Sequence, residues 1–199
     1  MSLLWNEFDP TEKQIRSKTS EFVNRVIRPH AISDDRDCLF RREVFQQAAA
    51  LGYHSLSQPA AYGGGEKSHR YYYAFLEEIA RGSVANAISI SVTNLTQGAI
   101  STFGNEEQKQ TYLPALGKGL LIGCFGLTEP NHGSDPGGME THATAHQEGW
   151  ILSGAKTWIT NSPIADIFIV WAKDAGEIKG FLLEKGMEGI SAPKIEGKF

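Results

Sequence analysis

The sequence predicts an α+β protein in which an N-terminal α-helical bundle over residues 1–117 precedes an incomplete antiparallel β-sandwich or barrel over residues 118–199. In the first part, apolar residues recur at helical spacing and the segments begin at capping residues. After residue 116, where fourteen of the 21 glycines lie, apolar residues form short runs and alternations, as in strands separated by turns. With 199 residues, the chain is long enough for two domains that each bury a core.

The first predicted helix begins at Asp9. Asp9 is a suitable N-cap, Pro10 suits the first helical position, and Glu12 follows three residues after the cap. Apolar residues then recur at helical spacing as far as Ile27, and Pro29 is expected to end the helix.

The remaining predicted helices are punctuated by Gly and Pro. Residues 41–51 form a helix that ends at Gly52, and residues 57–65, with Pro59 and three consecutive glycines, form a loop. Three further helices span residues 71–81, 84–103 and 105–113. The last begins at an Asn105 cap with Gln108 three residues later, and Pro114 is expected to stop it.

The second half predicts short strands with turns between them. These strands cover residues 120–127, 141–146, 150–152, 167–172 and 179–183. A further strand is expected to end near Asn161 and to present Trp158 and Thr160 on one face, because strand side chains alternate with a period of two.

Composition excludes several classes of protein. The formal net charge is -4, so there is no basic excess of the kind that binds nucleic acid, and no apolar run is long enough to span a bilayer. Met1–Glu7 lacks the features of a secretory signal, and Cys38 and Cys124 form no CxxC pair. We therefore expect a reduced compartment, either the cytoplasm or, in a eukaryote, the mitochondrial matrix.

Two dense patches carry the chemistry. In the first, an apolar run breaks at Thr128-Glu129-Pro130 into the polar loop that reaches Gly133-Ser134-Asp135, and such a loop suits a phosphate or a flat polar ring. In the second, Gly154 to Asn161, an indole and a hydroxyl on one face offer an apolar slab beside a hydrogen-bonding group. This pairing is what a tricyclic cofactor such as a flavin needs.

In this order, the two patches resemble the flavin-binding signature of the acyl-CoA dehydrogenase family. The resemblance covers essentially the whole chain and is closest to the glutaryl-CoA dehydrogenase branch, through Gly180 to Met187. It implies an FAD-dependent enzyme that dehydrogenates an acyl-CoA thioester at its α,β-bond and passes electrons to an electron-transfer flavoprotein. It also implies a homotetramer when the chain is complete.

The resemblance further implies which residues contact FAD. The flavin ring and pyrophosphate would be lined by Phe125, Leu127, Thr128, Gly133 and Ser134, with Ser134 also close to the substrate. From the second patch, Trp158, Ile159 and Thr160 would contribute, Trp158 covering the ring edge and Thr160 donating near N5. Donors placed where negative charge develops would favour hydride arrival.

No catalytic residue is expected within these 199 residues. In the family, the glutamate that removes the α-proton lies in a C-terminal helical domain, and we interpret Glu129 as structural. Residues 190–199 supply no final element that would complete a core, so the chain is expected to be truncated. In glutaryl-CoA dehydrogenases an Arg-Ser pair binds the distal carboxylate, and its register falls here on Ala85-Asn86, with Arg81 about one turn away.

Other functions remain open at this point. The chain is alternatively a non-catalytic protein of the same fold that binds flavin or acyl-CoA, or an oxidase of that fold. A metal site at His142 and His146 is not expected, because on a strand their side chains lie roughly 13 Å apart at about 3.3 Å per residue. Hydrolase chemistry at Ser134 is not expected either, because no G-x-S-x-G motif frames it.

Overall fold

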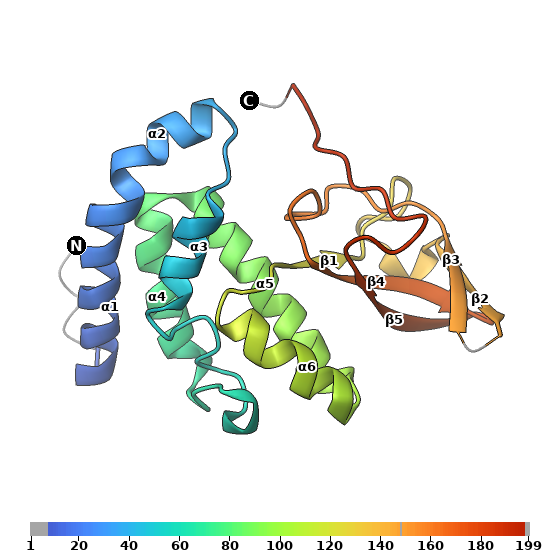
Figure 1. Cartoon of the computed structure of the whole chain (residues 1–199), viewed down its shortest axis with the longest axis horizontal. Helices are drawn as coiled ribbons and strands as arrows, with labels where there is room; N and C mark the ends of the chain where they lie inside the picture. The colour runs from blue at the N-terminus through green and yellow to red at the C-terminus, as the bar shows by residue number, and fades with distance from the viewer. Residues whose placement is uncertain (1–7, 148, 198–199) are drawn as a thin grey trace. The chain divides into compact units, whose positions relative to one another are not determined.

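The structure is a computed structural model that describes residues 8–147 and 149–197. The chain divides into two compact units, residues 1–120 and 121–199. Helices make up the first unit and a sheet dominates the second (Figure 1). The prediction of a helical domain followed by a β domain is therefore confirmed, whereas Met1–Glu7 and the last two residues, Lys198 and Phe199, lie outside the described part.

The helical unit is built from α1 (Pro10–Phe22), α2 (Arg28–Arg36), α3 (Arg42–Ala49), α4 (His69–Gly82), α5 (Val84–Phe103) and α6 (Glu106–Gly117). In this unit α1 packs on α4, α4 on α5, and α5 on α6 (Figure 1). Its core includes Phe45, Phe75, Ile79, Leu113 and Leu116, none of which is more than 1% exposed.

Two helix starts follow the sequence prediction in atomic detail. The side chain of Asp9 accepts a hydrogen bond from the backbone N–H of Glu12 at 2.9 Å. At α6, Asn105 and Gln108 each accept from the backbone N–H of the other, at 2.8 and 2.9 Å, which makes a complete capping box. Both caps are local contacts between residues three apart, and for that reason a sequence pattern can predict them.

The expectation that Pro29 ends the first helix is wrong. After α1 the chain makes one π-helical turn, Val23–Ile27, in which the N–H of Arg28 donates to the carbonyl of Val23. Pro29 is the second residue of α2, where a missing N–H removes no hydrogen bond within the helix. The π-turn resets the hydrogen-bond pattern ahead of the proline, so the helical path continues.

Pro114 also fails to stop its helix. It lies inside α6, which continues to Gly117, and the Pro114 carbonyl accepts from Lys118 N–H at 3.1 Å. Leu113 and Leu116 beside it are 1% and 0% exposed. Their burial offsets the one lost hydrogen bond.

His54 is a buried titratable group in this core. Its ring lies 4.9 Å from the ring of Phe45 and 5.7 Å from that of Phe75, and it is 1% exposed. Burial lowers the pKa of His54 from 6.5 to about 3, so the ring is neutral in the folded protein. The unfolded chain takes up a proton below pH 6.5, and stability is therefore complete above that pH and declines as the pH falls towards 3.

We expect the free energy of unfolding to fall by about 1.4 kcal/mol per pH unit below pH 6.5 through His54 alone. Urea unfolding at pH 7 and pH 5 measures this loss, and His54→Leu should reduce the difference between the two pH values. The shifted carboxylates titrate below this window, so they do not mask the effect. An unchanged difference in His54→Leu would contradict the assignment.

The second unit holds one five-stranded mixed sheet. Its strands are β1 (Gly123–Gly126), β2 (His142–His146), β3 (Gly149–Ser153), β4 (Ile167–Asp174) and β5 (Glu177–Glu184). β5 pairs antiparallel along the whole of β4, so β1 and β2, both parallel to β4, share its other edge, and β3 pairs antiparallel to β2. The sheet therefore departs from the antiparallel arrangement that was expected, because alternation within a strand carries no information about strand direction.

Candidate functional site

The polar loop of the first patch follows the end of β1. Phe125 is half-buried, with its ring 5.8 Å from that of Trp171 on β4, and Leu127 and Thr128 are half-buried after it. A Cβ at Gly126 would lie 3.2 Å from the Ile169 carbonyl and 3.5 Å from Lys156 Cγ. The carbonyl of Ile169 is therefore the tight contact at this position, whereas the distance to Lys156 is an ordinary van der Waals contact.

Glu129 accepts the hydrogen bonds that connect this loop to residues 140, 141 and 156. Its side chain is 3% exposed, and Oε1 accepts from Lys156 Nζ at 2.7 Å and from Thr141 N–H at 2.9 Å, while Oε2 accepts from Glu140 N–H at 2.6 Å. Burial opposes ionisation, but the hydrogen bonds from Lys156 and from the backbone of residues 140 and 141 outweigh it and lower the pKa of Glu129 to about 2. The carboxylate therefore stays ionised, with hydrogen bonds on both of its oxygens.

The second patch is not a strand. β3 ends at Ser153, and residues 154–161 follow an irregular path with turns. Gly154 has φ 150°, and a Cβ there would lie 2.7 Å from Thr141 Cα, so this turn requires glycine. The prediction of Trp158 and Thr160 on one face of a strand is wrong, because left-handed backbone at Trp158 and Asn161, with φ of 58° and 69°, breaks the extended path.

Trp158 is held in a strained and exposed position. A bulky residue at φ 58° is an outlier, and the side chain is 67% exposed. Its neighbour Ile159 instead packs against the buried cluster of Cys124, Ala165 and Phe168. Strain of this kind is concentrated at functional sites, where the surrounding structure enforces it.

The fold brings the two patches together. The N–H of Thr157 donates to the carbonyl of Thr128 at 2.9 Å, and Lys156 Nζ donates to the carbonyl of Leu127 at 3.1 Å. At the other end, Asn161 Nδ2 donates to the carbonyl of Gly123 at 3.0 Å. Residues 156–161 are thus tied to β1 and to the loop after it, and Trp158 and Thr160 lie between the ties.

The described residues fit a flat ring that carries phosphate groups. Trp158 offers an exposed indole face, and Thr128 and Thr160 offer half-buried hydroxyls. Gly133 and Ser134 are exposed at the loop tip, and a Cβ at Gly133 would meet nothing within 4 Å. Within the described chain, the N–H groups of Thr128, Gly133 and Ser134 donate to no protein acceptor, so they are available to an anion.

Ala85 and Asn86, onto which the register of the Arg-Ser pair of glutaryl-CoA dehydrogenases falls, lie in the helical unit. Ala85 and Asn86 stand in the first turn of α5, where the N–H of Asn86 donates to Ser83 Oγ at 3.3 Å. Ala85 is exposed and Asn86 is half-buried. Neither carries a positive charge.

Other candidate chemistry is sparse in residues 8–147 and 149–197. Those residues contain no group of three or more His, Cys, Asp or Glu side chains that could hold a metal ion. Both His142 and His146 lie on β2 and are exposed. Among the helices of the described chain, none has the length and apolar character needed to cross a membrane.

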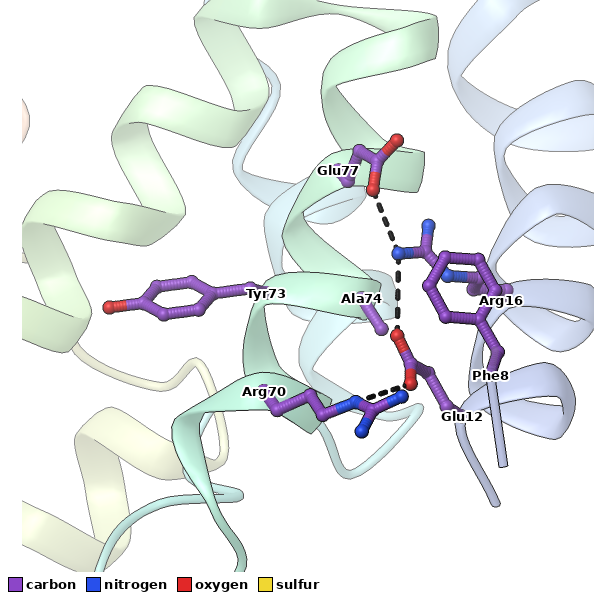
Figure 2. A pocket seen from close by; sticks show the side chains of 7 residues that line it. All are labelled: Phe8, Glu12, Arg16, Arg70, Tyr73, Ala74 and Glu77. Atoms are coloured by element: carbon purple, nitrogen blue, oxygen red, sulfur yellow. Dashed lines mark hydrogen bonds and ion pairs between the residues drawn. The ribbon is translucent and has the colours of Figure 1, made fainter. Parts of the chain in front are cut away.

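A pocket between α1 and α4 is lined by Phe8, Glu12, Arg16, Arg70, Tyr73, Ala74 and Glu77 (Figure 2). Its charged groups pair with one another: Arg16 contacts Glu77 at 2.8 Å and Arg70 contacts Glu12 at 2.7 Å. The pocket is therefore a structural ion-pair site of the helical unit. Sequence reasoning missed it, because its partners lie about 60 residues apart.

Sequence reasoning also missed Lys156 and Asn161 as members of the site. Both stand within the second patch, but nothing in their spacing predicts that Lys156 reaches Glu129 or that Asn161 reaches Gly123. For the contact between Lys156 and Glu129, the sequence offers only one signal: both are charged residues, and both stand within the two patches.

Comparison with known proteins identifies the two units. The family model of the acyl-CoA dehydrogenase N-terminal domain matches residues 9–120, and that of the acyl-CoA dehydrogenase middle domain matches residues 124–199. Mitochondrial isovaleryl-CoA dehydrogenase of Pongo abelii is 36% identical over 199 residues, which cover 95% of this chain and 47% of the relative.

Solved structures give the same result. A glutaryl-CoA dehydrogenase from Mycobacterium smegmatis in complex with FADH2 matches with TM-score 0.92 and 33% identity, over 96% of this chain and 50% of that one. A structure of the electron transferring flavoprotein of Acidaminococcus fermentans matches with TM-score 0.91 and 31% identity, over 100% of this chain and 53% of that one. The chain thus spans about half the length of the relatives it matches.

Proposed function

This chain belongs to the acyl-CoA dehydrogenase family, and on that premise we propose that it forms the flavin-facing part of an FAD-dependent enzyme that dehydrogenates an acyl-CoA thioester at its α,β-bond. The observation that carries the proposal is the exposed Trp158, held in left-handed backbone between one hydrogen bond to the Thr128 loop and one to β1. A strained aromatic residue beside free hydroxyls and N–H donors is a site prepared for a planar ligand.

FAD, when bound, supplies the hydride-accepting chemistry. The residues that would hold its ring are Trp158, Thr128 and Thr160, which offer an indole and two hydroxyl donors, together with Phe125, Leu127 and the backbone of Ile159. The N–H groups of Gly133 and Ser134 hold the pyrophosphate, with Ser134 also reaching the substrate. The hydrogen bonds of Thr157 and Asn161 hold the segment that carries Trp158 and Thr160, which limits the reorganisation that binding requires.

The base that removes the α-proton lies outside these 199 residues. Glu129 is the one carboxylate in the signature loop between Thr128 and Ser134, and its oxygens already accept three hydrogen bonds. Its pKa of about 2 makes it a poor proton acceptor. The curated relatives are about twice as long as this chain, which leaves room for the base elsewhere in the protein.

Partners and compartment follow from the same premise. An electron-transfer flavoprotein takes up the electrons, and the complete protein is a homotetramer. The compartment is the cytoplasm or, in a eukaryote, the mitochondrial matrix, in keeping with the mitochondrial relatives.

A monocarboxylic acyl-CoA is the preferred substrate. A distal carboxylate at the start of α5 would meet Ala85 and Asn86, which provide no cation, and burying an unpaired carboxylate is costly. Arg81 on α4 already pairs with Glu77 at 2.9 Å. We expect a higher kcat/KM for saturated monocarboxylic acyl-CoAs than for glutaryl-CoA, and a clear preference for glutaryl-CoA would contradict this assignment.

The proposed function is tested by FAD binding. The full-length protein should purify with non-covalently bound FAD, or should perturb the visible spectrum of FAD added to the apoprotein. Intact protein that is colourless and leaves the spectrum of added FAD unchanged would remove the proposal and would favour a non-catalytic chain that binds acyl-CoA.

Oxygen consumption distinguishes a dehydrogenase from an oxidase of the same fold. The full-length protein, given FAD and acyl-CoA in air, should consume little oxygen until an electron acceptor is added. Rapid stoichiometric oxygen uptake would assign it to the oxidases of the fold.

A further inference from the structure

The ion pair between Glu129 and Lys156 joins the three segments on which the proposed flavin site depends. Lys156 Nζ bridges Glu129 Oε1 at 2.7 Å and the Leu127 carbonyl at 3.1 Å. Through its second oxygen, Glu129 binds the N–H of Glu140 at 2.6 Å. The pair thus ties the loop after β1 to the start of β2 and to residues 156–161.

Both side chains of this pair are shielded from solvent. Glu129 and Lys156 have side chains that are 3% and 10% exposed. Removing one partner from such a pair leaves an uncompensated buried charge, which disturbs the structure around it. An exposed ion pair in the same unit, Lys179 with Asp174 at 2.7 Å, has a lysine side chain that is 45% exposed and provides a matched comparison.

The ion pair of Glu129 and Lys156 acts on Trp158 through Thr157, which lies between Lys156 and Trp158 in the sequence. Thr157 follows Lys156 directly, and its N–H donates to the Thr128 carbonyl at 2.9 Å. Beyond Trp158, Ile159 packs into the buried cluster and Asn161 binds the Gly123 carbonyl at 3.0 Å. The left-handed backbone of Trp158 is unfavourable for a bulky residue and persists only where its flanks are fixed.

We propose that Glu129 and Lys156 are positioning residues that fix Trp158 and Thr160 relative to the Thr128 hydroxyl before any cofactor binds. The predicted effect on FAD affinity rests on the proposed function. The predicted ordering of residues 154–161 does not. The pair sets the shape of the flavin wall without contacting the ring.

The test uses the full-length protein with Glu129→Gln and Lys156→Met, and with Lys179→Met as the matched control. In the absence of FAD, amide hydrogen exchange of residues 154–161 should become at least about tenfold faster in the first two variants, because the Thr157 and Asn161 ties loosen. FAD affinity, from titration of the flavin spectrum, should fall by about tenfold or more, because small displacements of positioned groups are costly. Lys179→Met should match wild type in both measurements.

Lys156→Arg keeps the test decisive if the other variants fail to fold. It preserves a cation beside Glu129, but a guanidinium cannot reproduce a single nitrogen that bridges two acceptors. We expect a folded protein with FAD affinity reduced by about threefold or more and with a shifted flavin spectrum.

The outcomes separate the two proposals. Wild-type exchange and wild-type FAD affinity in Glu129→Gln, or in Lys156→Arg, would overturn the positioning role while leaving the proposed function intact. Wild-type protein that binds no FAD would overturn the proposed function, and the exchange measurement would still decide whether the pair orders residues 154–161.

Discussion

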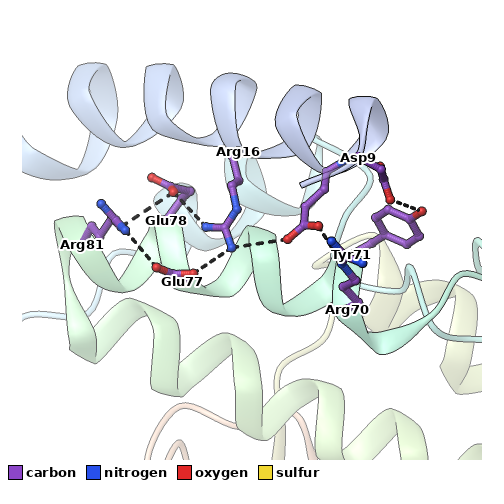
Figure 3. Close-up of polar contacts among 8 residues, drawn as sticks. Asp9, Arg16, Arg70, Tyr71, Glu77, Glu78 and Arg81 are labelled. Carbon is purple, nitrogen blue, oxygen red and sulfur yellow. Dashed lines mark hydrogen bonds and ion pairs between the residues drawn. The ribbon is translucent and has the colours of Figure 1, made fainter. Parts of the chain in front are cut away.

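Arg16→Met should lower the free energy of unfolding of the helical unit by up to about 3 to 5 kcal/mol, because it removes the buried cation that three carboxylates share and leaves them only the partly exposed Arg70 and Arg81. Arg16 on α1 contacts Glu78 at 3.1 Å, Glu77 at 2.8 Å and Glu12 at 3.5 Å. Figure 3 shows the Arg16 guanidinium beside Glu77 and Glu78 of α4, and Figure 2 shows it beside Glu12 of α1. The side chains of Glu12 and Glu78 are only 3% and 6% exposed, so water cannot replace the lost contacts.

Chemical denaturation followed by the helical circular dichroism signal measures this loss. Arg36→Met is the matched control, because the ion pair of Arg36 with Asp37 is exposed, with side chains 73% and 54% exposed, and its midpoint should stay at the wild-type value. Adding Glu78→Gln to Arg16→Met should recover part of the lost free energy of unfolding, because it removes one of the buried carboxylates that Arg16 neutralised. A loss below about 1 kcal/mol in Arg16→Met would show that the network contributes little.

The second large effect concerns catalysis by the 199-residue chain alone. Mixed anaerobically with FAD and a saturated acyl-CoA, it should not bleach the visible absorbance of the flavin, whereas the full-length protein should. The absence of a general base alone costs about 10² to 10⁴ in rate, and Glu129 is a poor substitute because hydrogen bonds from Lys156 and two backbone N–H groups occupy its oxygens and lower its pKa.

Chemical reduction of the same mixture provides the control, since it shows that the flavin in the sample can still be bleached. Stoichiometric bleaching by the 199-residue chain and acyl-CoA would mean that a base lies within this sequence. The assignment of Glu129 as structural would then be wrong.

Local patterns predicted the parts of the fold that depend on neighbours in the sequence. The Asp9 cap and the Asn105 capping box involve residues three apart, and the five strands of the sheet were expected close to where they occur. The prediction that Pro29 and Pro114 end their helices was wrong, because the effect of a proline depends on the structure around it. A π-turn precedes Pro29, and buried leucines flank Pro114.

Long-range contacts explain what the sequence could not predict in the site. Trp158 leaves the extended conformation because Thr157 and Asn161 bind β1 and its loop, 29 and 38 residues earlier in the chain. The Arg16 network joins α1 to α4 in the same way. The residue types of the signature were recognisable, but the ties that orient them exist only in the folded chain.

The central claim, that Trp158 and Thr160 form the flavin wall, is tested most directly by FAD titration of the full-length protein and its variants. We expect Trp158→Ala and Thr160→Ala each to weaken FAD binding by about threefold to tenfold, or to shift the bound-flavin spectrum, because an aromatic contact or a hydrogen bond is worth about 0.5 to 1.5 kcal/mol. Trp150→Ala, which removes a 52% exposed tryptophan from β3, should leave affinity and spectrum unchanged. Wild-type affinity and spectrum in both Trp158→Ala and Thr160→Ala would contradict the account.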